Sequence, residues 1–181
     1  IPFTETDPMT DRTISPYAAT KKACEVLAHT YHHIYGMNIN VVRPFTVYGP
    51  RGRPDMVMWI FLEKALKGEP IPKFGDGTAQ RDYTYIADFV KGFVAALDKP
   101  LGYEIFNIGN DDPVELNKVI EWLGEITGKE IKMNQLPKQP GDVDRTHADL
   151  TKARKLLGYN PQTSVRDGMQ QFYEWYRKTH S

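Results

Sequence analysis

The stretch INVVRPF, residues 39–45, decides the fold class that this sequence predicts. Its β-branched and aromatic side chains are typical of a buried strand, and Pro44 is expected to end it. A helix is expected directly before it, because Ser15 is a good N-cap, Pro16 a good first helical residue and Gly36 a good helix stop. A helix followed at once by a buried strand is one step of a parallel α/β sheet.

The rest of the chain alternates between helical and extended patterns, which is typical of an α/β protein. The stretch YEIFNIG, residues 103–109, predicts a second buried strand. Short strands are expected within residues 70–85 and 129–137. Helices are expected at residues 55–68, 86–99, 113–126, 150–158 and 165–179. Only the stretches at 39–45 and 103–109 have the character of central parallel strands, which is fewer than a complete doubly wound sheet contains.

Local signals set the expected ends and faces of these helices. Pro113 is expected to open one helix, and Ser164 with Asp167 to form a capping box at the start of another. On the first helix an apolar stripe at helical spacing is expected to pack inward. The stripe consists of Cys24, Leu27, Ala28, Tyr31 and Ile34. We therefore expect Cys24 to be a small core residue rather than a nucleophile.

The composition argues against several classes of function. Lysine plus arginine and aspartate plus glutamate both total 23 in 181 residues, so the zero net charge favours neither nucleic acid nor an anionic membrane as a partner. No apolar run approaches the roughly 20 residues needed to span a bilayer. The single cysteine cannot form an internal disulfide, which suits the reducing cytoplasm. His29, His32 and His33 have a metal-compatible spacing, but no cysteine or carboxylate ligand set accompanies them, so no metal site is predicted.

The start of the first helix, SPYAATKK at residues 15–22, places a tyrosine four residues before a lysine. Tyr17 and Lys21 therefore share one face of the helix. A neighbouring positive charge stabilises a tyrosine phenolate, so such a pair can transfer protons near neutral pH. The same spacing also fits an ordinary pair on a solvated helix surface, and the two residues alone leave both interpretations open.

Five motifs point together to one protein family. They are SPYAATKKACE at 15–25, VVRPFTVYGPRGRPDM at 41–56, QRDYTYIADFV at 80–90, FNIG at 106–109 and PGDVDRTHAD at 140–149. In order and spacing they resemble the C-terminal half of the extended short-chain dehydrogenase/reductase family. Within that family the chain is most similar to the nucleotide-sugar epimerases, specifically the UDP-glucuronate 4-epimerases.

The resemblance implies an α/β fold: the C-terminal portion of an NAD-binding Rossmann-type domain with a small substrate-binding α/β lobe. Residues 1–50 and 82–110 would form the Rossmann-type part, and residues 51–81 and 111–181 the lobe that binds the UDP-sugar. The glycine-rich NAD loop of the family is missing from this sequence, so we expect the N-terminal NAD-binding half to be absent and the isolated chain to be inactive. Such a chain is expected to form a homo-oligomer or to pair with the missing half.

The resemblance also implies a reaction. Tyr17 would take the proton of the sugar 4-hydroxyl while C4 passes its hydride to NAD, and the resulting 4-keto sugar would be reduced on its other face. Lys21 would hold the nicotinamide ribose hydroxyls, Tyr17 would also belong to the cofactor-binding residues, and Pro44 would abut the nicotinamide carboxamide. Thr46 and Arg53 would bind the C5 carboxylate of a uronate as a charge-assisted cluster.

Residues further along the chain would bind the nucleotide. By resemblance, Arg81 would contact the UDP diphosphate, for which the forked guanidinium is well suited. Asp142 would contact the nucleotide ribose. Lys73 and Phe74 would lie along the uridine, with Tyr85 nearby.

The sequence leaves three alternatives to a UDP-glucuronate 4-epimerase. Two are enzymes, a UDP-glucuronate decarboxylase and a UDP-glucose 4-epimerase-like enzyme, and they differ from it in their products. The third belongs to another class, a non-catalytic fragment that binds UDP-sugar weakly or only self-associates.

Overall fold

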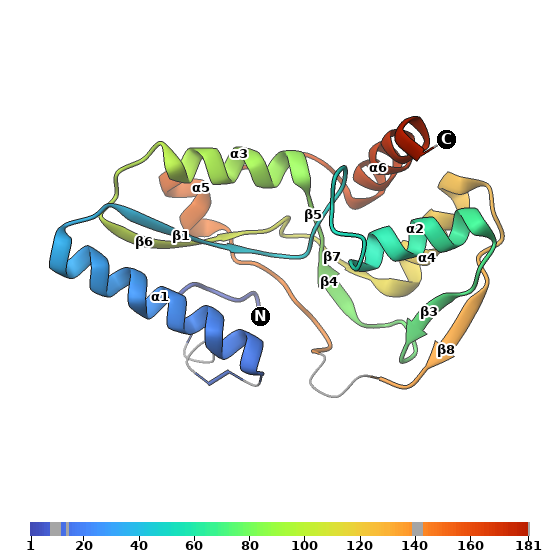
Figure 1. The fold of residues 1–181 in the computed structure, drawn as a ribbon, viewed down its shortest axis with the longest axis horizontal. Coiled ribbons are helices and arrows are strands. Elements are labelled where there is room, and N and C mark those ends of the chain that lie inside the picture. Colours follow the sequence, from blue (N-terminus) through green and yellow to red (C-terminus); the bar gives the residue numbers. More distant parts are fainter. Residues whose placement is uncertain (8–11, 14, 139–142, 181) are drawn as a thin grey trace.

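The computed structural model describes residues 1–7, 12–13, 15–138 and 143–180 of the chain. Its elements form two lobes, which lie side by side in Figure 1. The sheet lobe consists of α1 (Pro16–Tyr35), β1 (Ile39–Pro44), α3 (Ile86–Leu97), β6 (Tyr103–Ile108) and α5 (Thr151–Leu157). The helical lobe consists of α2 (Val57–Lys67), β3 (Ile71–Phe74), β4 (Gln80–Asp82), β7 (Pro113–Glu115), α4 (Leu116–Thr127), β8 (Met133–Leu136) and α6 (Val165–His180). A short parallel pair, β2 (Val47–Tyr48) and β5 (Thr84–Tyr85), lies between the lobes.

The sheet lobe is built on the two parallel strands that the sequence predicts. β1 pairs with β6, with Val42 opposite Phe106. Successive side chains of a strand point to opposite faces of the sheet. Arg43 accordingly reaches α1, whereas Asn40 reaches the end of α3. The two helices therefore cover opposite faces of the strand pair, as Figure 1 shows.

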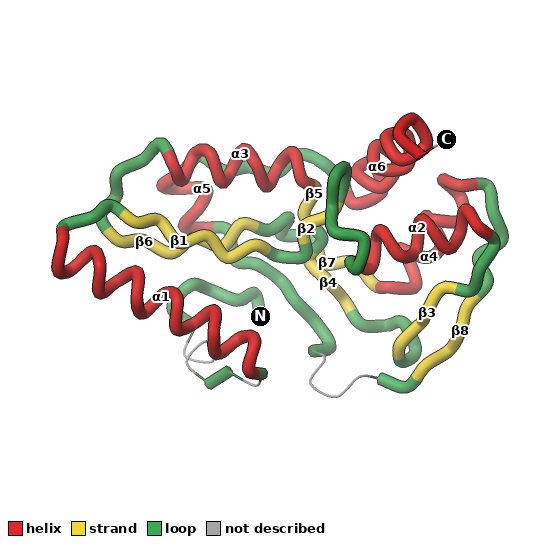
Figure 2. The backbone as a smooth tube through the Cα atoms, viewed as in Figure 1, coloured by secondary structure: helices red, strands yellow, loops and turns green. Residues whose placement is uncertain are grey.

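In the helical lobe α2, α4 and α6 pack together, and the short strands β3, β8, β4 and β7 lie beside them (Figure 2). β3 pairs in parallel with β8, and β4 pairs antiparallel with β7. Each pair joins segments far apart in the sequence, so neither is a hairpin. Among the described residues, no helix is both long enough and apolar enough to cross a membrane.

Two separate sets of buried apolar side chains form the cores. The helical core lies among α2, α4 and α6, and its buried members include Met58, Phe61, Leu62, Val119, Leu123, Val165, Met169 and Phe172. The sheet core is smaller, and its buried members are Ala96, Phe106, Ile108, Ala148, Leu150, Ala153, Leu157 and Tyr159. The division of the chain into residues 1–50 with 82–110 and 51–81 with 111–181 stays a prediction. The packing of α5 and Tyr159 differs from it, because both belong to the sheet core.

Several helix ends follow the signals in the sequence. Ser15 Oγ accepts a hydrogen bond from the backbone N–H of Ala18 at 3.2 Å, and Gly36 ends α1 with a φ of 64°. Glycine adopts this left-handed conformation readily because it has no Cβ. Ser164 Oγ accepts from the N–H of Asp167 at 3.1 Å and donates to its carboxylate at 2.7 Å, which forms the expected cap of α6.

The apolar stripe of α1 does not pack inward, so that prediction is wrong. Leu27, Tyr31 and Ile34 are all more than half exposed. Cys24, predicted to be a core residue, is exposed as well. Among the described residues of α1, the buried one is Glu25. Helical spacing identifies an apolar face but not what covers it, and the described part of this chain leaves this face open.

Pro113 does not open a helix, which is a second correction. Pro113 to Glu115 form β7, opposite β4, and α4 begins at Leu116. The backbone N–H of Leu116 donates to the carbonyl of Ala79 at 3.0 Å, so the strand ladder continues to the start of the helix. Proline suits both a helix start and the first position of a strand, because neither needs its missing N–H. Local sequence therefore does not separate the two.

Candidate active site

A cavity of about 580 Å³ opens between α1, the C-terminal end of β1 and the segment that precedes α5. Four of the predicted site residues line it: Tyr17, Lys21, Pro44 and Thr46. Ligands of open α/β sheets bind at the carboxyl ends of the strands, and this cavity lies at such an end of β1. The fold thus brings the predicted proton-transfer pair next to the predicted uronate-binding threonine.

Tyr17 and Lys21 reach the cavity from adjacent turns of α1. Lys21 Nζ lies 5.4 Å from the centroid of the Tyr17 ring, in cation–π geometry. Tyr17 is 72% exposed, so its hydroxyl is accessible to a ligand. A phenol beside an ammonium group, both open to the cavity, can exchange a proton with a molecule bound there.

Backbone hydrogen bonds fix the chain where it leaves β1. The N–H of Phe45 donates to the carbonyl of Ile108 at 3.0 Å, and the carbonyl of Thr46 accepts from the N–H of Thr84 at 3.1 Å. Thr46 is therefore held between the sheet lobe and the short β2–β5 pair. Its backbone therefore has a defined place on the cavity wall.

Part of the cavity wall is an ion pair that the sequence analysis missed. Arg43 Nε and Nη2 donate to the two carboxylate oxygens of Glu25 at 2.6 and 2.8 Å. Burial acts to raise the pKa of Glu25, but the hydrogen bond and charge of Arg43 outweigh it and hold this pKa below its usual value. The sequence did offer one sign of Glu25, because this glutamate lies one helical turn after Lys21 on the same face. Nothing local, however, marks an arginine 18 residues away as its partner.

Arg53, the predicted carboxylate ligand, lies on the exposed loop after β2 and does not line the cavity. Its Nε and Nη2 donate to the two carboxylate oxygens of Asp55 at 3.0 and 2.5 Å. The hydrogen bond and charge of Asp55, with a smaller contribution from Tyr17, raise the pKa of Arg53. The arginine is therefore already in the forked geometry that binds a carboxylate.

The predicted nucleotide ligands Lys73, Phe74 and Arg81 lie on β3 and β4, outside the cavity lining. The strand of Arg81 is nevertheless joined to the cavity wall. Thr146 lines the cavity, and its backbone N–H donates to the carbonyl of Gln80 at 3.1 Å. The position of β4 relative to the cavity is thereby fixed.

Two further residues were predicted to lie near the nucleotide, Asp142 and Tyr85. Asp142 lies outside the described residues. Tyr85 is a core residue, 7% exposed, with its ring centroid 5.8 Å from that of Tyr48. Burial raises the pKa of Tyr85. Both residues of β5 are buried, so little of the Tyr85 side chain is open to a ligand, and its place near a uridine stays a prediction.

A family profile described as the NAD dependent epimerase/dehydratase family matches residues 1–109. The chain belongs to this family. Among its curated relatives, a UDP-glucuronate 4-epimerase from Thermodesulfobacterium geofontis is 49% identical, over 96% of this chain and 54% of that protein. UDP-glucuronate 4-epimerase 4 of Arabidopsis thaliana is 43% identical, over 100% of this chain and 45% of that protein. The chain thus spans about half the length of the curated relatives it matches.

Solved structures of epimerases have the same fold. The UDP-glucuronic acid 4-epimerase from Bacillus cereus, in complex with UDP-glucuronic acid and NAD, is 40% identical with a TM-score of 0.87, over 92% of this chain and 54% of that one. A UDP-glucose 4-epimerase from Thermotoga maritima, solved with UDP-glucose, is 36% identical with a TM-score of 0.87, over 93% and 55%. The α/β fold expected from the sequence is therefore confirmed.

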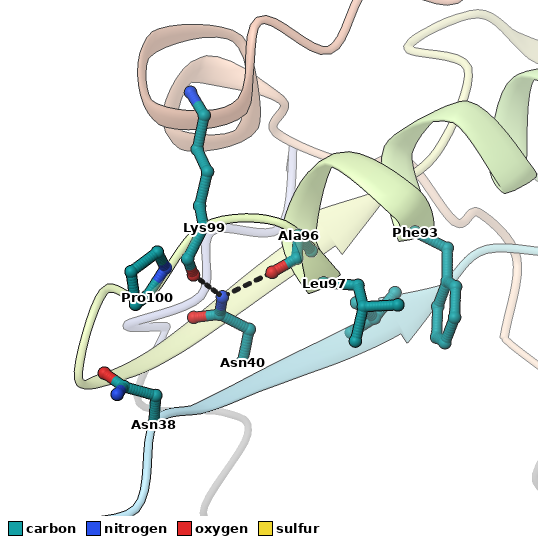
Figure 3. A pocket seen from close by; sticks show the side chains of 8 residues that line it. Asn38, Asn40, Phe93, Ala96, Leu97, Lys99 and Pro100 are labelled. Atoms are coloured by element: carbon teal, nitrogen blue, oxygen red, sulfur yellow. Dashed lines mark hydrogen bonds between the residues drawn. The ribbon is translucent and has the colours of Figure 1, made fainter.

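This epimerase/dehydratase family member has a second hollow, of about 190 Å³, between β1 and the end of α3. Figure 3 shows the Asn40 amide there, with Nδ2 donating to the carbonyls of Ala96 and Lys99 at 2.6 and 2.7 Å. Phe93 and Leu97 line the hollow, which contains none of the predicted site residues. Asn40 satisfies carbonyls at the C-terminal end of α3, so its role is structural.

The histidines of α1 pack rather than form a ligand set. The His29 and His32 rings lie 5.0 and 6.1 Å from that of Tyr103, centroid to centroid. His32 Nδ1 is 2.7 Å from the carbonyl oxygen of Met37. Within the described ranges, no group of three or more histidine, cysteine, aspartate or glutamate residues is placed to hold a metal ion.

Proposed function

We propose that this protein is an NAD-dependent UDP-glucuronate 4-epimerase, which interconverts UDP-glucuronate and UDP-galacturonate. The observation that carries the proposal is the cavity that gathers Tyr17, Lys21 and Thr46 at the end of β1. The relatives named as UDP-glucuronate 4-epimerases support it, as does the B. cereus enzyme that binds UDP-glucuronic acid and NAD.

The cavity lining fits a nicotinamide cofactor. Lys21 offers an ammonium with three donors to the ribose hydroxyls, and Pro44 offers an apolar surface on the same wall. When bound, NAD supplies the reversible redox step at C4 of the sugar. The residues of this chain then have to bind the substrate and move one proton.

Tyr17 carries that proton. As a phenolate it takes the proton of the sugar 4-hydroxyl, and it returns the proton to the same oxygen after the sugar has turned over in the site. The ammonium of Lys21 lies 5.4 Å from the centroid of this ring and lines the same cavity.

Thr46 and Arg53 hold the uronate carboxylate in this proposal. Arg53 exchanges Asp55 for the substrate carboxylate and keeps the same forked geometry. A uronate oxidised at C4 is a β-keto acid and loses carbon dioxide readily. A firm grip on its carboxylate is therefore what separates an epimerase from a decarboxylase.

The UDP moiety is proposed to bind along the strands of the helical lobe. Arg81 binds the diphosphate, Lys73 and Phe74 border the uridine, and Asp142 holds the ribose. The bond between Thr146 and Gln80 supports this placement, because it joins β4 to the cavity.

Product analysis of the complete gene product tests the proposal. With UDP-glucuronate and NAD we expect UDP-galacturonate, of unchanged mass and separable by chromatography, and we expect Tyr17→Phe to abolish its formation. Formation of UDP-xylose, with loss of carbon dioxide, identifies a decarboxylase instead. Conversion of UDP-glucose to UDP-galactose identifies the alternative that the T. maritima relative favours. Absence of all three products leaves the non-catalytic alternative.

Two further outcomes refine the result. Because the chain spans about half the length of its curated relatives, we expect the 181 residues alone to show no NAD-dependent turnover. In the complete gene product, Arg53→Ala is expected to slow epimerisation and to release decarboxylated sugar. If epimerisation is unchanged and no decarboxylated product forms, the role given to Arg53 is wrong.

We also propose that the protein self-associates through α1. This helix exposes five large apolar or aromatic side chains, those of Val26, Leu27, Tyr31, Ile34 and Tyr35. Together they form a large solvent-exposed apolar surface, which is typical of an interaction site. Pairing with a further segment of the same protein is the other arrangement that would bury exposed apolar surface. We place the reaction in the cytoplasm, a reducing compartment that suits the free, exposed thiol of Cys24.

A further inference from the structure

We propose that Glu25 and Arg43 are positioning residues, whose ion pair sets the orientation of α1 and so places Tyr17 at the end of β1. The inference deepens the proposed function and rests on it. Neither residue is given a chemical step. Both act through the position of the helix that carries the acid/base.

The geometry of the pair is that of a rigid joint. Two parallel hydrogen bonds of 2.6 and 2.8 Å join the guanidinium of Arg43 to the carboxylate of Glu25, which is 8% exposed. The remaining nitrogen, Nη1, donates to the carbonyl of Glu5 at 3.2 Å. Lys22 Nζ adds a second cation 3.4 Å from Glu25. Forked pairs of this kind fix orientation as well as distance.

Polar and ring side chains make further contacts between α1 and the sheet. The Tyr103 hydroxyl, on β6, donates to the backbone carbonyl of Glu25 at 2.9 Å. The ring of His29 packs edge-on against Tyr103. The large apolar side chains of α1, such as Leu27 and Ile34, are more than half exposed. The hydrophobic stripe that holds most helices in place is therefore not what seats α1 on the sheet.

The ion pair of Glu25 with Arg43 links the two elements that carry the proposed reacting groups, α1 and the end of β1. Glu25 follows Tyr17 by eight residues, about 12 Å along the helix axis, and Arg43 directly precedes Pro44 on β1. One ion pair therefore connects the helix of the acid/base to the strand end that carries Pro44 and leads to Thr46. A displacement of about 1 Å at a reacting group costs on the order of 100-fold in rate. A loosened joint is thus expected to lower kcat.

Three variants of the complete gene product test this inference. Glu25→Gln removes the charge with little change of shape, and Arg43→Lys keeps the charge but loses the fork. Glu63→Gln is the matched control, because it removes the exposed ion pair of Glu63 with Lys67, 2.6 Å apart on α2. We measure kcat and KM for UDP-glucuronate, together with amide hydrogen exchange in α1 and α4.

Both joint variants are expected to lower kcat by about 10- to 100-fold, with KM within about twofold. Exchange of the α1 amides is expected to rise about tenfold while α4 is unchanged, because the opening is local. The control is expected to match the wild type in every reading. If Arg43→Lys keeps the wild-type kcat, the forked joint is not what places Tyr17, and the inference is overturned.

The kinetic and exchange measurements distinguish failure of this inference from failure of the proposed function. If exchange rises equally in α1 and α4 and kcat falls only with the folded fraction, the pair is a general stabiliser and the inference is overturned. If Tyr17→Phe still turns over substrate, the proposed function fails, whereas α1 exchange still decides whether the pair seats the helix. If Glu25→Gln does not fold, Arg43→Lys and the exchanged pair Glu25→Arg with Arg43→Glu decide the outcome.

Discussion

The helical lobe and the sheet lobe differ in how completely their helices bury their apolar side chains. In the helical lobe, α2, α4 and α6 turn their apolar faces toward one another, and Phe172 is 3% exposed. In the sheet lobe, Leu27 on α1 is 59% exposed and Leu97 on α3 is 74% exposed. Both lobes carry amphipathic helices, but in the sheet lobe α1 and α3 leave large apolar side chains exposed. An apolar pattern therefore shows which face a helix can bury, not that the same chain buries it.

The position of aromatic residues explains much of the closure. Trp59 of α2 lies against α6, with its ring centroid 5.5 Å from that of Phe172 and 5.9 Å from that of Trp175. Large flat side chains bury much area for each residue and lose little conformational freedom. Between α1 and the sheet the described residues form a smaller set of rings, His29, His32 and Tyr103, beside the ion pair of Glu25 with Arg43.

Phe172→Ala tests this difference with the largest effect that we expect. The substitution leaves a cavity in the helical core and should lower the free energy of unfolding by about 3–5 kcal/mol. Leu97→Ala is the matched change in the sheet lobe and should lower it by no more than about 0.5 kcal/mol. Urea titration followed by circular dichroism measures both values. Similar losses for the two variants would contradict the contrast between the lobes.

The sequence predicted those parts of the fold that depend on local signals. Ser15 and Gly36 mark the ends of α1 because a cap needs only its neighbours, and the β-branched run at residues 39–45 marks β1 for the same reason. The pairing of β3 with β8 joins distant segments and has no local signature. Pro113 failed as a helix start because a proline suits two different starts.

The candidate site divides in the same way. Tyr17, Lys21 and Thr46 were found because each belongs to a short motif, and all three line one cavity. Glu25 and Arg43 were missed because an ion pair across the fold depends on where a helix and a strand meet. The roles of Tyr17, Lys21 and Thr46 at a bound ligand stay proposals.

Asp82 tests how firmly the two lobes are joined. Its carboxylate is fully buried on β4 and accepts hydrogen bonds from the N–H groups of Asn110, Asp111 and Ala148, at 2.7, 3.2 and 2.9 Å. Asp82→Asn replaces one accepting oxygen with a donor that faces an N–H, and it should cost about 2–3 kcal/mol of unfolding free energy. Thermal and urea unfolding measure the loss. Asp112→Asn, at an exposed position close by, should stay within about 0.5 kcal/mol.

Asp88 forms a second junction, between α3 and the chain entering α6, and its effect should depend on pH. Burial acts to raise the pKa of Asp88, but hydrogen bonds from Thr163, Lys91 and Gln162 outweigh it and hold the pKa below its ordinary value. A lowered pKa in the folded state gives stability that is present above the unfolded value of about 3.9 and is lost as pH falls through the folded value. Asp88→Asn should therefore cost about 1–2 kcal/mol at pH 7.

The measurement for Asp88 is urea unfolding of both proteins from pH 7 down to about pH 2. The two unfolding free energies should converge as the wild-type carboxylate becomes protonated. A constant difference across this range would show that the shape of the side chain, rather than its charge, makes the junction.

Leu27→Asp should have the smallest effect on folding stability, but it should weaken self-association. The side chain is exposed on α1, so the unfolding free energy of the separated chain should change by no more than about 0.5 kcal/mol. A charge in the centre of an apolar interface, in contrast, opposes association. Light scattering should therefore report a smaller mass for Leu27→Asp than for the wild type. Met133→Asp, which is also exposed but lies on β8 of the helical lobe, should leave the mass unchanged. Equal masses for Leu27→Asp and the wild type would mean that the open face of α1 is not where copies of this protein meet, and that the contrast between the lobes has another cause.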